Sequence, residues 1–106
     1  MNTVQILKDA RDLIANKGWS QGTWGRDEFG NSTQGVNDRT CSFCTMGAIY
    51  AAGKFDLHST KIDRFVRALG FEGEGSVISW NDNPRTTWEK VLDRFDVAIK
   101  SEEMKC

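Results

Sequence analysis

Three cysteines and one histidine are the residues of this 106-residue chain with the most reactive side chains. Cys41 and Cys44 have the Cys-x-x-Cys spacing at the start of a predicted helix, where backbone N–H groups favour a thiolate. This spacing is compatible with a zinc site or a redox pair. Zinc needs about four ligands, and the only further soft donors are His58 and Cys106. Because a second ligand pair is missing, we expect no metal site and no cofactor.

Redox or nucleophilic chemistry at the thiols would need other partners. A thioredoxin-like protein alternates strands and helices, and the sequence lacks that pattern. A cysteine nucleophile needs a base, so Cys44 would have to pair with His58, the only histidine. Gln21 would then donate to an oxyanion and Asn81 would orient the imidazole. The apolar run after Cys44 favours another interpretation, in which Cys44 is a small buried hydrophobic residue and Cys41 lies at the surface.

A second candidate site combines aromatic and amide side chains. Trp80-Asn81-Asp82 precedes a proline turn, where short polar side chains bond nearby backbone groups and fix the start of the last helix. The functional alternative is a concavity beside the central helix, because aromatic walls with a few convergent polar groups are typical of binding sites. The residues of this predicted concavity are Trp19, Gln21, Trp24, Trp80, Asn81 and Asp82.

The segment 18–40 is rich in glycine and polar residues and carries charges of both signs. Mixed charges are typical of a solvated face, and they do not favour a phosphate backbone, so we expect no nucleic-acid partner. Exposed aromatic residues beside arginine are typical of protein-binding hot spots. Trp24, Arg26 and Phe29 are therefore the predicted contacts with a protein partner.

The elements that position these residues are predicted to be mostly α-helical. Apolar spacing predicts helices over 3–17, with Ile6 on the buried face, over 59–69 and over 87–100. The run Phe43–Ala52 is apolar on all sides and predicts a buried central helix. Gly53 is expected to end that helix in the left-handed conformation.

The remaining segments are predicted from turn and cap signals. Ser76–Trp80 is expected to form a further helical turn, with a brief strand as the alternative, and the run from Asn81 to Pro84 is expected to end it. Thr86 with Glu89 predicts a capping box. The insert of residues 18–40 is predicted as a short β-hairpin turning near Gly30-Asn31, with flanks Gly22–Arg26 and Ser32–Val36, or as an irregular ordered loop. Residues 101–106 are expected to be a frayed tail.

Composition limits the class of protein. Fourteen basic and fifteen acidic residues give a formal charge of −1, unlike the basic excess of nucleic-acid-binding proteins. No apolar run reaches the roughly 18 residues of a membrane span, and the N-terminus lacks the apolar core of a signal peptide. An odd number of cysteines does not favour a disulfide framework. We expect one domain over residues 1–106, in a reducing cytoplasm and without a membrane partner.

Three short motifs recur as a set: Gly18-Trp19-Ser20-Gln21-Gly22, Cys44-Thr45-Met46-Gly47-Ala48, and Trp80-Asn81-Asp82 before a C-terminal helix. Together they resemble a family of small bacterial and bacteriophage proteins of unknown function, whose pattern is Gly-Trp-x-Gln-Gly, Cys-x-x-Gly-Ala and Trp-Asn-Asp. The resemblance spans most of the chain. It implies a bacterial or phage origin and supplies no activity. Cys41 lies outside this pattern, which disfavours chemistry that needs both thiols.

From these observations we expect a small, non-enzymatic binding protein with a protein partner. The resemblance to phage proteins extends this expectation to a modulator or inhibitor of a host or defence protein. The alternative is a small-molecule-binding protein or an enzyme, which would use a pocket of Gln21, Asn81 and Asp82 with Cys44. The oligomeric state and the identity of the partner stay open.

Overall fold

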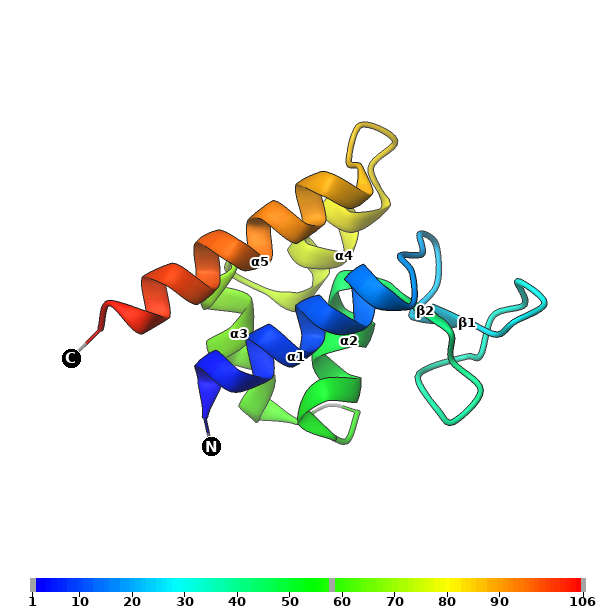
Figure 1. Cartoon of the computed structure of the whole chain (residues 1–106), viewed down its shortest axis with the longest axis horizontal. Helices are drawn as coiled ribbons and strands as arrows, with labels where there is room; N and C mark the ends of the chain where they lie inside the picture. Colours follow the sequence, from blue (N-terminus) through cyan, green and yellow to red (C-terminus); the bar gives the residue numbers. More distant parts are fainter. Residues whose placement is uncertain (1, 58, 106) are drawn as a thin grey trace.

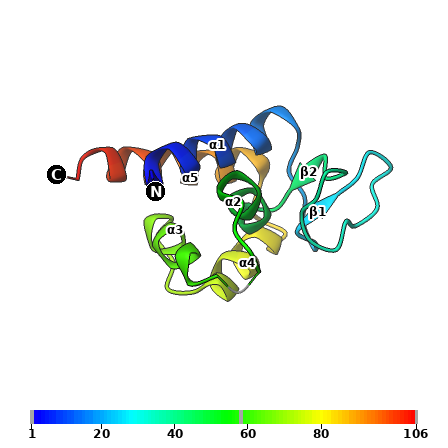
Figure 2. The same ribbon diagram turned by 90° about the horizontal axis from the view of Figure 1, so that it is seen from below.

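The computed structural model describes residues 2–57 and 59–105 as a mostly helical fold with a two-stranded sheet. The helices form two layers, with α1 and α5 running in opposite directions in one layer and α2, α3 and α4 in the other (Figures 1 and 2). The strands project from one end. In chain order the elements are α1 Thr3–Asn16, β1 Gly25–Arg26, β2 Ser42–Phe43, α2 Thr45–Gly53, the 3₁₀ turn η1 Thr60–Ile62, α3 Asp63–Ala68, α4 Glu74–Asp82 and α5 Trp88–Glu103. The predicted mostly-α fold class is confirmed.

Helix α1 begins after Asn2, whose Oδ1 accepts a hydrogen bond from the Gln5 backbone N–H at 3.0 Å. Its buried face consists of Leu7, Ala10 and Ile14, at the spacing of one helical stripe. Ile6, which the sequence pattern places on that face, is only half-buried. Helix α1 contacts α5 in its own layer and α2 in the other layer.

Helix α2 is the buried central helix that the apolar run predicts. All six residues from Thr45 to Tyr50 are buried, so this helix has little solvent face. The predicted left-handed residue is wrong, because Lys54 and not Gly53 has a φ of +53°. Gly53 has a different role: a Cβ at this position would collide with the ring of Phe55, so the glycine makes room for an aromatic side chain.

The insert of residues 18–40 forms a small sheet with the segment that follows it. Strands β1 and β2 pair antiparallel, with Gly25 opposite Phe43. A Cβ at Gly25 would collide with the Thr40 side chain, so β1 needs a glycine where it passes that residue. The Cys44 backbone N–H donates to the Trp24 carbonyl at 3.1 Å, which ties the sheet to the start of α2.

The predicted hairpin is wrong in its second strand, expected over Ser32–Val36. A single bridge, between Arg26 and Ser32, joins the two flanks. Directly beyond it, Gln34 and Gly35 have φ values of +53° and +131°, which are outside the extended region that a strand needs. The chain from there to β2 is an irregular loop, so the insert combines one tight turn with one longer loop.

Helix α4 continues two residues further than the proline rule predicts. Asn81 and Asp82 form its last turn, and Asn83 is the first extended residue, with φ −63° and ψ +132°. Pro84 restricts only the residue immediately before it. The prediction of a turn over Asn81 and Asp82 is therefore wrong, and both side chains are held at helical positions.

Helix α5 starts and ends later than predicted. Thr87 caps it, with Oγ1 accepting from the Lys90 backbone N–H at 3.3 Å. Thr86, the predicted cap, instead donates its hydroxyl proton to the Trp80 carbonyl at 2.6 Å. The helix continues to Glu103, so residues 101–103 are not part of a frayed tail. Its buried stripe closes the core, whose largest fully buried side chains are Phe65, Phe95, Leu7, Ile14, Met46, Ile49 and Leu69.

Candidate functional site

Asn81 joins three separate parts of the chain through one amide. It is 1% exposed, and its Oδ1 accepts from the Trp19 indole N–H at 2.8 Å. The same oxygen accepts from the backbone N–H and the hydroxyl of Thr45 at 2.9 and 2.7 Å. Its Nδ2 donates to the Ser20 carbonyl at 3.1 Å and to Asp82 Oδ1 at 2.9 Å. The loop after α1, the first turn of α2 and the end of α4 therefore meet at this side chain.

Gln21 and Gly22 extend the same contact along the end of α4. The Gln21 Nε2 donates to the carbonyls of Asn81 and Asn83, both at 3.0 Å. The Gly22 backbone N–H donates to Asp82 Oδ1 at 2.9 Å. Carbonyls in the last turn of a helix lack hydrogen-bond donors within the helix. The Gln21 amide supplies donors to two such carbonyls at the end of α4.

We call this set of residues the motif clamp. Every polar atom of the Asn81 amide and the Gln21 amide nitrogen bond within the protein. This use of the polar groups supports the structural interpretation of the sequence motifs rather than a ligand pocket built on them. The residues of the motif clamp are Trp19, Ser20, Gln21, Gly22, Thr45, Asn81 and Asp82.

The other two tryptophans of the predicted concavity, Trp24 and Trp80, pack against separate aromatic side chains. The Trp24 ring lies on Tyr50, with centroids 4.7 Å apart. The Trp80 ring lies 5.5 Å from that of Phe71, and the Arg94 guanidinium stacks over both rings at 5.3 and 5.2 Å. Both tryptophans are half-buried, so much of each ring is covered by other residues of the protein.

The Cys44 thiol lies at the N-terminus of α2, next to a small cavity of about 110 Å³ that also touches Trp24 and Asp82. Its Sγ accepts from the Gly47 backbone N–H at 3.2 Å, so the thiol caps the helix. Burial raises the pKa of Cys44 to about 11, against the lowering effect of the backbone N–H groups of Gly47 and Met46. The thiol stays protonated at neutral pH, which does not suit a nucleophile or a metal ligand.

The cysteine pair is not joined by a disulfide, because Cys41 and Cys44 are both free, the first exposed and the second buried. Within residues 2–57 and 59–105, no group of three His, Cys, Asp or Glu side chains is placed to hold a metal ion. The predicted partners His58 and Cys106 lie outside the described residues, so the Cys44–His58 hypothesis is not tested by this geometry.

The turn at the tip of the insert is held by its own side chains. Asp27 Oδ1 accepts from the backbone N–H groups of Phe29 and Asn31 at 2.9 and 3.0 Å. The Arg26 guanidinium donates to the Gly30 carbonyl at 3.0 Å and the Gln21 carbonyl at 3.1 Å. Arg26 therefore fixes the turn to the motif clamp, and its charge is directed at backbone oxygens rather than at solvent.

Of Trp24, Arg26 and Phe29, the predicted contacts with a protein partner, only Phe29 is exposed, with 79% of its surface accessible. Beside it is a hollow of about 440 Å³, lined by Asp27, Glu28, Phe29, Asp38, Arg39 and Cys41. We call the segment 27–31 together with this hollow the insert tip. Its three acidic residues and one arginine give it a negative local charge.

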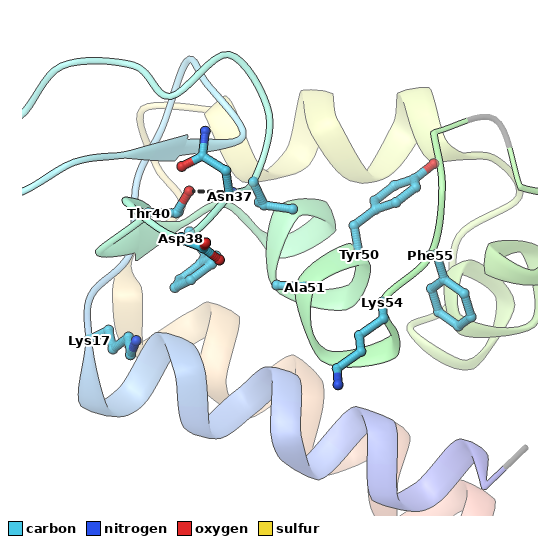
Figure 3. Close-up of a pocket in the computed structure, with 10 residues that line it drawn as sticks. Lys17, Asn37, Asp38, Thr40, Tyr50, Ala51, Lys54 and Phe55 are labelled. Carbon is cyan, nitrogen blue, oxygen red and sulfur yellow. Dashed lines mark hydrogen bonds between the residues drawn. The ribbon is translucent and has the colours of Figure 1, made fainter.

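A groove beside α2 was missed by the sequence analysis. It has a volume of about 610 Å³ and lies between the C-terminal ends of α1 and α2 and the loop before β2 (Figure 3). Its lining residues are Lys17, Val36, Asn37, Asp38, Thr40, Phe43, Tyr50, Ala51, Lys54 and Phe55. They come from three segments with no common spacing, so no motif in the sequence points to this groove.

A family model matches residues 1–101 of the chain. The chain belongs to DUF6197, a family of unknown function. The predicted membership of a family without an assigned activity is therefore confirmed. Neither the comparison with curated proteins nor the comparison with solved structures returns a match. The motif clamp and the insert tip both lie inside the DUF6197 match.

No helix in the described part of the chain is long and apolar enough to cross a bilayer.

Proposed function

We propose that this DUF6197 chain is a small non-enzymatic protein that binds a protein partner through the insert tip. The observation that carries the proposal is the 79% exposure of Phe29 on a hydrogen-bonded turn. A phenylalanine held away from the core gives up the burial free energy of a large apolar side chain, about 1.5–3 kcal/mol. Burial in a partner recovers this contribution.

The order of the tip supports binding rather than a tolerated surface residue. Asp27 accepts two hydrogen bonds from backbone N–H groups of the turn, and Arg26 donates one to a carbonyl of the turn and one to the Gln21 carbonyl of the motif clamp. A turn that is already ordered loses little conformational entropy on binding, which favours affinity. Phe29 is thus presented as a rigid anchor of the kind that fills a pocket at an interface core.

The charges around Phe29 indicate the chemistry of the partner. Glu28 and Asp38 are exposed, and with Asp27 they outnumber Arg39 at the hollow. A complementary surface has an apolar pocket for the phenyl ring and a lysine or arginine beside it for the hollow. The resemblance of the motifs to bacterial and phage proteins supports a host or defence protein as the target, with this chain as its modulator or inhibitor.

The experiment is site-specific photocrosslinking in cells that express the full chain. A benzoylphenylalanine replaces Phe29 in one variant and Val97 in the other. Val97 is a matched control because it is also exposed and apolar, at 66%, but lies on α5 away from the tip. We expect one dominant crosslinked protein from position 29 and none from position 97.

The partner found in this way is then tested with purified proteins. Phe29→Ala is expected to weaken its binding by about 2 kcal/mol or more, as for a hot-spot residue. Glu28→Lys should weaken it further through repulsion from a basic rim, and Val97→Ala should leave it unchanged. Equal binding by wild type and Phe29→Ala would overturn the proposal.

A further inference from the structure

The groove of Figure 3 has a floor and walls of apolar and aromatic side chains below a polar edge. Tyr50 and Phe55 come from α2 and the residues after it, and Ala51 lies on the side of Tyr50 that faces Lys17 and Asp38. The Tyr50 hydroxyl donates to Glu74 Oε1 at 3.0 Å, which fixes the ring. A volume of about 610 Å³ is in the range of pockets that hold small organic ligands, roughly 300–1,000 Å³.

Two uncharged polar side chains at the edge, Asn37 and Thr40, are held in the loop before β2. Asn37 Oδ1 accepts from the Arg39 backbone N–H at 2.9 Å. The Thr40 hydroxyl donates to Thr33 Oγ1 at 3.0 Å and accepts from the Asn37 backbone N–H at 2.9 Å. These bonds give the edge a defined shape before any ligand arrives.

Three charged side chains of the lining differ from this pattern. Lys17, Asp38 and Lys54 make no side-chain hydrogen bond or salt bridge to the part of the chain that the structure describes. The two lysines stand at the C-terminal ends of α1 and α2 and line the groove on different sides (Figure 3). With one carboxylate against two ammonium groups, the groove has a net positive charge.

The backbone at Lys54 is a second, independent observation. Its φ of +53° and ψ of +43° are left-handed, a conformation that costs a residue with a Cβ about 1–2 kcal/mol and that glycine adopts freely. Gly53 stands directly before it without a positive φ. A lysine suits the negative end of a helix, which explains one lysine at each helix end but not a lysine in place of glycine at a left-handed position. Strained residues of this kind cluster at ligand sites.

We propose that this groove binds a small molecule with an anionic group attached to an apolar ring. The anionic group, a carboxylate, sulfonate or phosphate, lies at the edge of the groove, in the positive field of the Lys17 and Lys54 ammonium groups. The ring lies on Ala51 beside Tyr50, two residues that line the groove. Asp38 limits the affinity for anions and favours ligands with a hydrogen-bond donor at the opposite end. This site is separate from Phe29 and does not depend on the protein partner proposed above.

The test uses 8-anilinonaphthalene-1-sulfonate, an aromatic sulfonate whose fluorescence rises in an apolar site. Its uncharged parent, N-phenyl-1-naphthylamine, is titrated in parallel. We expect Lys17→Gln and Lys54→Gln each to weaken binding of the sulfonate by roughly threefold, the size of a partly exposed ion pair. Binding of the uncharged parent should not change, and Lys100→Gln on α5 should change neither titration.

Two further variants have effects of opposite sign. Asp38→Asn should tighten sulfonate binding by roughly threefold, because it removes a like charge. Lys54→Gly should weaken sulfonate binding while leaving Tm equal or higher, because glycine accepts the left-handed backbone. The proposal would be overturned if the affinity for the sulfonate were unchanged in the Lys17, Lys54 and Asp38 variants. It would also be overturned if the affinities for the sulfonate and its uncharged parent changed equally in every variant. A fall in Tm for Lys54→Gly would remove the strain argument and count against it.

Discussion

Asn81 is a buried polar side chain whose desolvation is offset by complete hydrogen bonding. Its oxygen has three donors and its NH₂ group has two acceptors. A buried amide left with an unpaired atom would cost about 1–3 kcal/mol. Because an amide presents an acceptor and a donor group from the same carbon, no side chain of similar size can replace it here.

Asn81→Asp is therefore predicted to destabilise the protein strongly. The second carboxylate oxygen would face the Ser20 carbonyl and Asp82 Oδ1, which now accept protons from Nδ2. Loss of both donors next to an existing carboxylate should lower the free energy of unfolding by about 3 kcal/mol or more. Urea denaturation followed by far-UV circular dichroism measures this change.

The matched control is Asn83→Asp, two residues further along. Asn83 is exposed, and its Oδ1 only accepts a hydrogen bond, from the Arg85 backbone N–H at 2.9 Å. A carboxylate keeps that bond, so the free energy of unfolding should change by less than about 0.5 kcal/mol. Similar losses in both variants would mean that the amide network does not determine the stability of the clamp.

Cys44 makes the stability depend on pH in the alkaline range. Burial raises its pKa to about 11 from 9.0 in an exposed thiol. Above pH 9 the unfolded chain loses this proton while the folded chain keeps it, so the unfolded state binds fewer protons and stability falls as pH rises to 11. Two pKa units correspond to about 2–3 kcal/mol.

Comparison of wild type with Cys44→Ser isolates this contribution, because other groups titrate in both proteins. Serine keeps an oxygen acceptor for the Gly47 backbone N–H and does not ionise in this range. The wild type should lose about 2–3 kcal/mol more than the variant between pH 8 and pH 11, measured by urea denaturation. If the free energy of unfolding falls equally with pH in wild type and Cys44→Ser, the thiol is less buried than its cap position implies.

At the level of helices, the prediction succeeds where the signal is local. The apolar run from Phe43 to Ala52 has no polar face in any helical register, so its burial follows from composition alone. The prediction of a second hairpin strand was wrong because it paired β1 with the nearest following segment of the sequence. The actual partner, β2, follows a loop whose turn depends on Gln34 in a left-handed conformation, and nothing in the sequence marks that residue.

Packing of α2 against the insert gives the next prediction, Gly47→Ala. A Cβ at Gly47 would collide with the Trp24 carbonyl oxygen, the same oxygen that accepts from the Cys44 backbone N–H. Alanine favours the helix by about 1 kcal/mol, but backbone cannot move aside as a flexible side chain can. We expect a net loss of about 1–3 kcal/mol in the free energy of unfolding.

Gly75→Ala is the control for helix propensity. Gly75 lies in the first turn of α4, and a Cβ there would meet nothing within 4 Å. This variant should gain stability by about 0.5–1 kcal/mol. If Gly47→Ala stabilised the protein as much as Gly75→Ala in the same thermal denaturation series, the Trp24 carbonyl would not lie as close to Gly47 as the structure has it.

Considered as a whole, the chain has one feature that local patterns cannot reveal. The three motifs are separated by more than twenty residues in the sequence, and Asn81 brings them to one point. The three motifs named from the sequence contain all the residues of the clamp. Sequence reasoning assigned them to a pocket or to the start of the last helix because their partners are distant in the sequence. The groove at Lys17 and Lys54 was missed for the same reason.

The clamp predicts that the insert unfolds together with the helices and not before them. Backbone N–H groups of Ser20, Phe43 and Cys44 bond across the junction at 3.0, 3.0 and 3.1 Å. Native-state hydrogen exchange should give these amides an opening free energy within about 1 kcal/mol of that for Ala48 in the core of α2. The amide of Gly30, which bonds only within the exposed tip, should open at a much lower free energy. Exchange of the junction amides at the rate of Gly30 would show that the insert is an independent appendage, and Phe29 would then be presented on a mobile loop.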